Sequence, residues 1–274
     1  MKASLSCRIA ESSSRKDIAA MPFAKLAFLA GEAGFSGMSM RASVISVEHS
    51  SKQQKAVRAI LNNNGLSASM VMGNVPLATN NAEAPDCLRD ITPHLDLAEC
   101  LGAKLVRVVV QTKSDIPQAQ RAADEAAERR ITLSQQSHWG TLCETVEECV
   151  EVMNLVDRPN FGITFEPANL LACGDDCGPD AIRRLAPHVV NFYFQNVRLD
   201  PNGAHTFHSR NKGTTNLTYV PLDNTSGIPI APLIGALREI GYDGWVSVHQ
   251  PLLDGQSVAD AIDEAARVFL PLVY

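Results

Sequence analysis

The sequence has no long apolar run and no cluster of basic residues. No apolar stretch reaches the ~18 residues of a membrane-spanning helix, and the opening stretch MKASLSCRIAESSSRK lacks the continuous apolar core of a signal peptide. The chain has 24 Lys and Arg against 30 Asp and Glu, which gives a net charge of -6. Because binding to nucleic-acid phosphates needs a basic surface, these absences predict a soluble cytoplasmic protein that binds neither nucleic acid nor a membrane.

Cysteine motifs are also missing. The seven cysteines are an odd number scattered through 274 residues, unlike the dense framework of a small disulfide-rich domain. Cys143 with Cys149, and Cys173 with Cys177, do not have the paired C-x-x-C spacing of a structural zinc site. We therefore expect reduced thiols in apolar surroundings, with zinc binding by either pair as the alternative.

What the sequence does contain is a regular alternation of short β-rich runs and longer amphipathic segments. The expected strands are ASLSCRI, GMSMR, SASMVMG, KLVRVVVQ, ITLSQQ, FGITFE, VVNFYFQN and GWVSVH. The expected helices span residues 22–34, 51–64, 85–101, 116–129, 145–156, 179–185, 230–240 and 258–269. Gly34, Gly65, Gly102 and Gly241 each follow a helical run, where a left-handed glycine ends a helix.

Eight strand and helix units in 274 residues match the size of an α/β fold of the (β/α)8 type, a single TIM barrel over residues 1–274. A doubly wound open sheet is the alternative. No G-x-G-x-x-G follows the first strand, so no nucleotide cofactor is expected.

In a TIM barrel, functional residues lie at the C-terminal ends of the strands and in the loops that follow them. The residues at which the apolar runs turn polar are Arg8, Glu11, Arg41, Asn74, Gln111, Gln136, His138, Glu166, Asn169, Gln195, Asn196, Arg198, His249 and Gln250. We expect them to surround a ligand at the mouth of the barrel.

An unusually long irregular loop is expected after the seventh strand, at about residues 198–227. Its sequence is rich in Gly, Asn, Thr and Ser, and it far exceeds the usual two to six residues of such a connection. A loop of this length indicates a lid, a binding loop or an oligomer contact. His205, His208, Arg210 and Lys212 lie on it, either within reach of a substrate or as solvated surface residues.

Four segments carry a resemblance to a known family: AAERRITLSQQSHWG, DRPNFGITFEPANL, RRLAPHVVNFYFQNVRLD and LREIGYDGWVSVHQP. With them the chain resembles the xylose isomerase-like superfamily of TIM barrels, the sugar phosphate isomerase/epimerase group, over nearly its whole length. In that family two Glu, one Asp and one His hold a divalent metal, which polarises a substrate carbonyl and the neighbouring hydroxyl. By local alignment the four ligand positions hold Gln136, Glu166, Gln195 and His249 here.

This altered set has two interpretations. Amide oxygens, a carboxylate and an imidazole are acceptable ligands for Mn, Mg or Zn, so the four residues can retain a divalent metal, held more weakly because the set carries less negative charge. Alternatively, the same amides bind sugar hydroxyls without a metal. A retained metal is favoured because polar residues still occupy all four positions.

The resemblance implies proton transfer next to the carbonyl of a sugar or sugar derivative. Gln136 cannot act as a base, so we expect His249 to be the general base, Glu166 a metal ligand or second base, and His138 a polarising hydrogen-bond donor. One strong base favours an isomerase over a two-face epimerase. The alternatives are a lyase or hydratase that acts on a keto-sugar, and a carbohydrate-binding barrel without catalysis.

The remaining polar strand ends are predicted to bind the substrate. These residues are Arg8, Arg41, Gln111, Asn169, Asn196, Arg198 and Gln250. The arginines favour an anionic or acid-bearing sugar, and Arg107, which lies early in its strand, fits either this group or a core ion pair. The outer helices and the long loop can also make a homo-oligomer, as in relatives.

Overall fold

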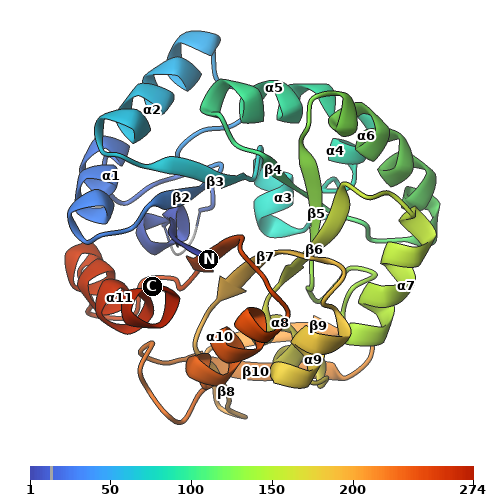
Figure 1. Cartoon of the computed structure of the whole chain (residues 1–274). Coiled ribbons are helices and arrows are strands. Elements are labelled where there is room, and N and C mark those ends of the chain that lie inside the picture. Colours follow the sequence, from blue (N-terminus) through green and yellow to red (C-terminus); the bar gives the residue numbers. More distant parts are fainter. Residues whose placement is uncertain (13–14) are drawn as a thin grey trace.

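The computed structural model describes residues 1–12 and 15–274. Eight parallel strands form a closed barrel in the order β1-β11-β7-β6-β5-β4-β3-β2, and helices surround it (Figure 1). The barrel strands are β1 (Lys2–Ser6), β2 (Gly37–Met40), β3 (Ser67–Val71), β4 (Leu105–Val108), β5 (Thr132–Gln136), β6 (Phe161–Phe165), β7 (Val189–Phe194) and β11 (Trp245–Val248). The predicted TIM barrel is confirmed, and the open-sheet alternative is wrong.

The helices follow the predicted alternation with a few differences. Their bounds are α1 (Phe23–Glu32), α2 (Ser51–Asn63), α3 (Val75–Thr79), α4 (Asp86–Arg89), α5 (Thr92–Leu101), α6 (Ile116–Glu128), α7 (Val146–Val156), α8 (Pro167–Cys173), α9 (Pro179–Arg184), α10 (Ile230–Glu239) and α11 (Val258–Val273), with 3-10 turns η1 (Cys7–Ala10) and η2 (Lys113–Asp115). The helix expected over 85–101 is divided into α4 and α5, because Asp90 leaves the helical region with φ -134° and ψ 81°. The short helices α3 and α8 were not expected.

Helix ends lie where the glycines predicted them. Gly102 closes α5 in the left-handed region at φ 73°, and its N–H bonds to the carbonyls of Ala98 and Glu99. Gly34, Gly65 and Gly241 also have positive φ. The turns back into the barrel strands are thus set by glycine.

Side chains of the barrel strands alternate between two environments. In β1, Ala3 and Leu5 are fully buried in the apolar core between the barrel and the helices. Ser4 faces inward, since its Oγ lies 2.7 Å from Ser69 Oγ on β3, a strand that is not its neighbour in the barrel. The inside of the barrel therefore carries polar side chains.

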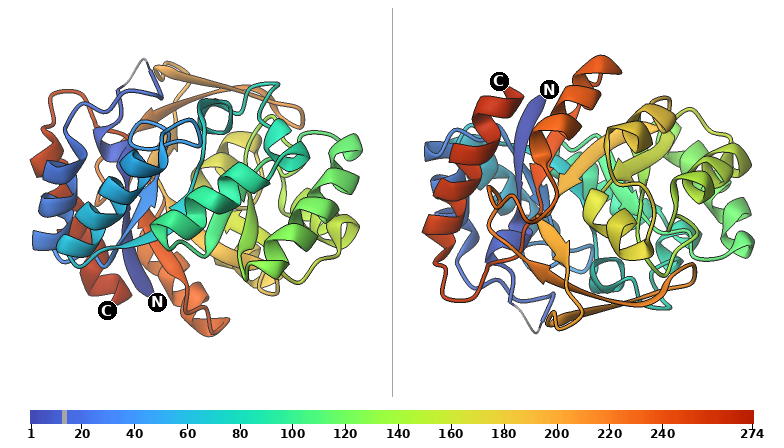
Figure 2. Two further views of the ribbon diagram at one scale, coloured as in Figure 1. Left: turned by 90° about the horizontal axis from the view of Figure 1, so that it is seen from above. Right: turned by 90° about the horizontal axis from the view of Figure 1, so that it is seen from below.

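The segment after β7 is more ordered than expected. It contains β8 (Val197–Leu199), β9 (His205–Ser209) and β10 (Gly213–Tyr219), which pair antiparallel in the order β8-β10-β9. This sheet lies across the end of the barrel away from the N-terminus (Figure 2). Asn, Gly and Thr in this segment indicated a loop, but the threonines of β10 suit a strand once β9 and β8 pair with it.

Membrane-spanning helices and metal-binding clusters of side chains were looked for in the described residues. No helix within residues 1–12 and 15–274 is long and apolar enough to cross a membrane. In the same residues no group of three or more His, Cys, Asp or Glu side chains comes together in a way that could hold a metal ion. The seven cysteines are unpaired, and Cys143, Cys149 and Cys173 are buried. The cysteine pairs therefore supply no zinc site of that kind.

Candidate functional site

A cavity of about 410 Å³ lies at the C-terminal ends of the barrel strands, where β9 and β10 also contribute to its wall. Polar residues reach it from the ends of several strands, as the TIM barrel fold predicts. They include Arg8, Arg41, Arg107, Gln136, Gln195 and His249.

Three side-chain amides meet the carboxylate of Glu166 at one side of this cavity. Gln136 Nε2 and Asn169 Nδ2 donate to Oε2, the latter at 2.9 Å, and Gln195 Nε2 donates to Oε1. Glu166 is fully buried, whereas the three amides line the cavity in front of it. Because the amide N–H groups are turned to the carboxylate, their carbonyl oxygens are left as acceptors. Gln195 Oε1 is buried and has no hydrogen-bond partner within the described residues.

Local structure fixes the position of Glu166. It follows β6 and occupies the N-cap position of α8 without a side-chain capping hydrogen bond. The first residue of α8 is Pro167, a residue suited to the first helical position. Its N–H donates to Ser137 Oγ at 2.9 Å. Burial raises the pKa of Glu166 to about 7, although Arg8 and the hydrogen bond from Gln136 act in the opposite direction.

His249 follows β11 and lines the same cavity. Its ring stacks on Tyr193, with ring centroids 4.1 Å apart and an interplanar angle of 12°. Nδ1 lies 2.8 Å from Ser6 Oγ, so Nε2 is the nitrogen available to a ligand. Burial, and next the positive charge of Arg8, hold the pKa of His249 well below its ordinary value of 6.5. The imidazole is therefore neutral at physiological pH.

His138 lies in the loop after β5 and is half-buried at the cavity. Its Nδ1 is 2.6 Å from the carbonyl oxygen of Trp139, which requires a proton on Nδ1 and leaves Nε2 as an acceptor. Burial, followed by the charge of Arg107, lowers the pKa of His138 to about 3. The hydrogen-bond donor role expected for His138 does not suit this tautomer, whose free nitrogen accepts.

Positive side chains line the opposite part of the cavity. Arg41 is buried and forms two hydrogen bonds with Glu11, at 2.8 and 3.0 Å, and Lys16 lies 3.3 Å from the same carboxylate. Arg8 donates to the Tyr219 hydroxyl at 3.0 Å. Burial, and next the charge of Arg8, lower the pKa of Lys16. This cluster gives the cavity an excess of positive charge.

Arg107 is fully buried in β4 and also lines the cavity. Its guanidinium donates to the carbonyl oxygen of Leu77 and, at 2.5 Å, to Asn80 Oδ1. Burial, followed by repulsion from Arg41, lowers the pKa of Arg107 to about 10. These partners are neutral, so the interpretation of Arg107 as a core ion-pair residue is wrong.

Four residues expected to bind substrate lie outside the cavity lining and have structural partners. Gln111 donates to the carbonyls of Asn80 and Asn81. Arg198 is exposed and pairs with Asp200 at 2.9 Å. Asn196 and Gln250 are buried and anchor the segment after β10.

Asn196 and Gln250 hold the chain that follows β10 through side-chain hydrogen bonds to its carbonyl groups. Asn196 Nδ2 donates to the carbonyls of Pro221 and Asn224, at 2.7 and 3.0 Å. Gln250 accepts the N–H of Asn196 at 2.8 Å and donates to the carbonyl of Val220 at 2.8 Å. Their polar atoms are used within the protein, because the chain after β10 has no regular structure to satisfy its own carbonyls.

Several cavity residues were not expected from the strand ends. Lys16 lies in the loop after η1, Tyr219 ends β10, and Trp139 and Phe207 form an edge-to-face pair with ring centroids 5.6 Å apart. Trp139 directly follows His138, so the same strand-end rule could have identified it as a cavity residue. Nothing in the sequence indicates Lys16 or Tyr219, because their positions depend on how long loops fold over the barrel.

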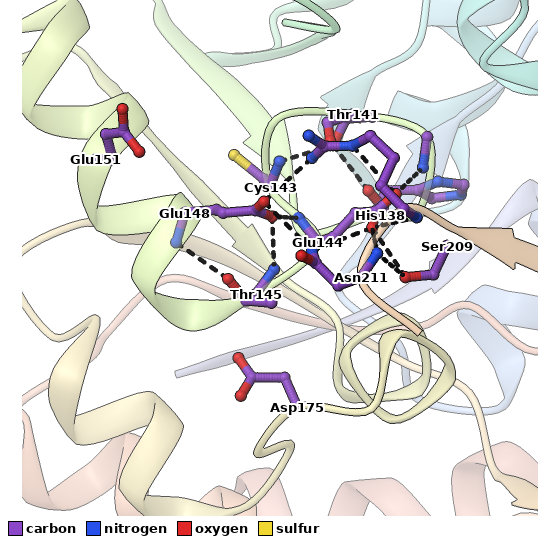
Figure 3. Close-up of polar contacts among 12 residues, drawn as sticks. His138, Thr141, Cys143, Glu144, Thr145, Glu148, Glu151, Asp175, Ser209 and Asn211 are labelled. Carbon is purple, nitrogen blue, oxygen red and sulfur yellow. Dashed lines mark hydrogen bonds and ion pairs between the residues drawn. The ribbon is translucent and has the colours of Figure 1, made fainter. Parts of the chain in front are cut away.

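A second buried carboxylate holds the β9–β10 hairpin against the loop after β5 (Figure 3). Glu144 is fully buried. It accepts hydrogen bonds from the N–H groups of Gly140 and Arg210, both at 2.8 Å, and from Ser209 Oγ at 2.9 Å. The N–H of Asn211 also donates to it, at 3.2 Å. Through this contact the hairpin that covers the cavity is fixed to the loop that carries His138.

The expected metal ligands are brought only partly together, and their donor set does not fit a divalent cation. Glu166 receives amide hydrogen bonds at both oxygens, where a cation would need lone pairs. Arg8 is the charge that acts most strongly on Glu166, and Arg107 and Arg41 act on it too. A divalent ion placed between one carboxylate and three guanidinium groups would be repelled. The side chains that line this part of the cavity therefore do not form a site for a divalent metal.

Solved structures of several different proteins share this architecture. A probable 3-DHS dehydratase, AsbF, from Bacillus anthracis superimposes with a TM-score of 0.70 at 18% identity, covering 98% of this chain and 99% of that one. A D-psicose 3-epimerase gives 0.71 at 16%, covering 100% and 99%. A xylose isomerase-like TIM barrel protein from Mycobacterium smegmatis in complex with magnesium gives 0.71 at 17%, covering 100% and 96%. At these identities the likeness shows the fold.

Sequence comparison finds curated relatives that match part of the chain. Two inosose dehydratases, from Lacticaseibacillus casei and from its strain BL23, are 27% identical over 182 residues, which is 57% of this chain. The match spans about 60% of the length of these relatives. A family model described as "Xylose isomerase-like TIM barrel" matches residues 27–271.

Proposed function

Because the chain belongs to the xylose isomerase-like TIM barrel family, we propose that it is a sugar isomerase-type enzyme that moves a proton next to a carbonyl, with His249 as the base. The observation that carries the proposal is the placement of His249. Its ring lies in the cavity, is fixed by Ser6 and Tyr193, and is held neutral. A neutral, oriented imidazole is the form that accepts a proton.

In the proposed step, Nδ1–H of His249 donates to Ser6 Oγ, and Nε2 removes a proton from the carbon next to the substrate carbonyl. The electron pair of that C–H bond forms a carbon–carbon double bond, and the carbonyl oxygen becomes an enolate oxygen. The guanidinium groups that line the cavity stabilise this negative charge. The hydroxyl proton on the deprotonated carbon passes to the enolate oxygen, and return of the proton from His249 to the former carbonyl carbon completes an isomerisation.

A second outcome of the same step is β-elimination, in which the enolate expels a hydroxyl group that leaves as water. The partial match to inosose dehydratases favours this alternative. His249 Nε2 carries the proton taken from carbon in the first step, and in this outcome it delivers that proton to the leaving hydroxyl. Both outcomes require the same first proton transfer from carbon to His249.

We assign Glu166 a positioning role in this scheme. It does not line the described part of the cavity, and it turns the amides of Gln136, Gln195 and Asn169 so that their oxygens can accept substrate hydroxyls. In this scheme Gln136, Glu166, Gln195 and His249 do not act as the metal ligands that were expected. The substrate is bound by hydrogen bonds and by the charges of the cavity lining.

The test is deuterium incorporation at carbon. The enzyme is incubated in D2O with an inosose, with 3-DHS and with D-fructose, and NMR records exchange next to the carbonyl and the product formed. We expect exchange with at least one substrate, unchanged by EDTA, and a loss on the order of 10²–10⁴-fold in His249→Gln. A new ketose or aldose indicates isomerisation, and an enone or its tautomer indicates elimination.

The matched control is His188→Gln, which alters a histidine just before β7, at the N-terminal end of the barrel. It is expected to keep wild-type exchange. Exchange that survives in His249→Gln, or that appears only with added Mg²⁺ or Mn²⁺, would contradict the proposal. The absence of exchange with every substrate would favour the carbohydrate-binding barrel instead.

A further inference from the structure

The wall of the cavity is divided into two arcs of different chemistry. In the closed barrel, β2 neighbours β1, and β3 connects β2 to β4; Arg8, Arg41 and Arg107 lie at these strands. The consecutive strands β5, β6 and β7 carry the amides of Gln136 and Gln195. β11 stands between β7 and β1, so His249 lies at one boundary between the cationic arc and the amide arc.

The positive charges of the cationic arc are unequally compensated. Arg41 forms a paired contact with Glu11. Within residues 1–12 and 15–274, Arg8 and Arg107 have no carboxylate within ion-pair distance, and the Nε atom of each is buried without a hydrogen-bond partner. Burying an uncompensated charge is costly, so a ligand that brings a negative charge would complete this arc.

We propose, on the basis of the proposed function, that the substrate is a polyhydroxylated carboxylic acid. Its carboxylate lies against the cationic arc with Arg8 and Arg107 as charge partners. Its hydroxyl groups donate to the amide oxygens of the other arc. This orientation places the carbons between the two groups beside His249.

A carboxylate fits the arc better than a phosphate. Barrels of this type bind phosphate with backbone N–H groups of the loops after the last two strands. Here the N–H of Asn196 donates to Gln250 Oε1 and that of His249 to the carbonyl of Phe194, both at 2.8 Å. Guanidinium groups bind carboxylate and phosphate alike, so the preference for a carboxylate rests on these two N–H groups being already used within the protein. A bound anion would also oppose the positive charges that lower the pKa of His249, which strengthens the base when substrate is present.

The experiment compares acids with their neutral counterparts in the full-length protein. Thermal shift and calorimetric titrations use D-glycerate, D-gluconate and D-glucuronate against glycerol, D-glucitol and D-glucose, at ionic strength matched with NaCl. Glucose 6-phosphate is included to separate phosphate from carboxylate recognition. We expect at least one acid to bind about tenfold or more tightly than its neutral counterpart, the size of one charged hydrogen bond, and more tightly than the phosphate.

The variants assign that preference to residues. Arg8→Met and Arg107→Met are each expected to reduce the affinity for the acid by about tenfold or more while affinity for neutral polyols is unchanged. Arg198→Met is the matched control, because Arg198 is exposed and paired with Asp200 outside the cavity. If the fully buried Arg107 is needed for folding, Arg8→Met, at the half-buried position, decides the result.

Equal or tighter binding of every neutral counterpart, tighter binding of the phosphate, or acid binding that is unchanged in Arg8→Met would overturn the inference. Acid binding is measured in His249→Gln as well, which removes the proposed base. Binding retained in that variant without deuterium exchange in the wild type would refute the proposed function alone. Exchange without a preference for acids would refute the carboxylate inference alone.

Discussion

Glu144 and Glu166 are both fully buried carboxylates surrounded by hydrogen-bond donors, yet they serve different parts of the molecule. Glu144 is held largely by main-chain N–H groups of two loops, including those of Gly140 and Arg210. Glu166 is held by side-chain amides that line the cavity, such as those of Gln136 and Gln195. The donor type distinguishes the roles, because main-chain donors fix a fold whereas amide donors expose a second polar end to a ligand.

The largest expected effect tests the structural half of this comparison. Glu144→Ala leaves the N–H groups of Gly140 and Arg210 and the hydroxyl of Ser209 without their acceptor. We expect a loss of about 3 kcal/mol in the free energy of unfolding, measured by urea denaturation. The control Glu147→Ala removes an exposed carboxylate that pairs with Arg184 and should cost less than about 0.5 kcal/mol. Equal losses of unfolding free energy in both variants would show that Glu144 does not hold the β9–β10 hairpin against the loop after β5.

The second prediction addresses the functional half. Glu166→Gln replaces the acceptor of three amides with a group that has one acceptor and one donor, so the amide oxygens lose their fixed direction. We expect KM to rise about tenfold with kcat changed by less than about threefold, measured by steady-state kinetics. A hundredfold fall in kcat with KM unchanged would instead make Glu166 a second base.

The third prediction is a pH dependence of stability. The folded protein raises the pKa of Glu166 from 4.5 to about 7, so between these values the folded state binds more protons at this group than the unfolded state. The contribution of Glu166 to the free energy of unfolding therefore falls as pH rises through this window. Relative to wild type, Glu166→Gln should become more stable from pH 4.5 to pH 7 in urea denaturation at several pH values. A difference that is constant with pH would refute the raised pKa.

The smallest expected effect is on the acid side of the pH-rate profile. The pKa of His249 lies well below 6.5, so its neutral form persists below the ordinary histidine range. Protonation of Glu166 near pH 7 is expected to act on KM, so the measurement is kcat at saturating substrate, which we expect to change less than about twofold between pH 8 and pH 6. Half-loss of activity near pH 6.5 would indicate a base with an ordinary histidine pKa.

The local alignment of strand ends anticipated part of the site. Gln136, Gln195 and His249 were expected at the mouth of the barrel, and all three line the cavity. Gln111 and Asn196, expected by the same rule, are used to hold loops. A polar residue at a strand end can face the axis or a neighbouring loop, and the sequence does not distinguish the two because loop conformation decides which partners are near.

The sequence by itself determined the barrel, because hydrophobic alternation and helix-ending glycines are local signals that recur along the chain. Only the tertiary structure decided which polar groups meet. Glu166 and Gln136 are 30 residues apart, and His249 and Ser6 are 243 residues apart. Closure of the barrel brings such residues together, and with them burial and neighbouring charge, which set the protonation of Glu166, His138 and His249.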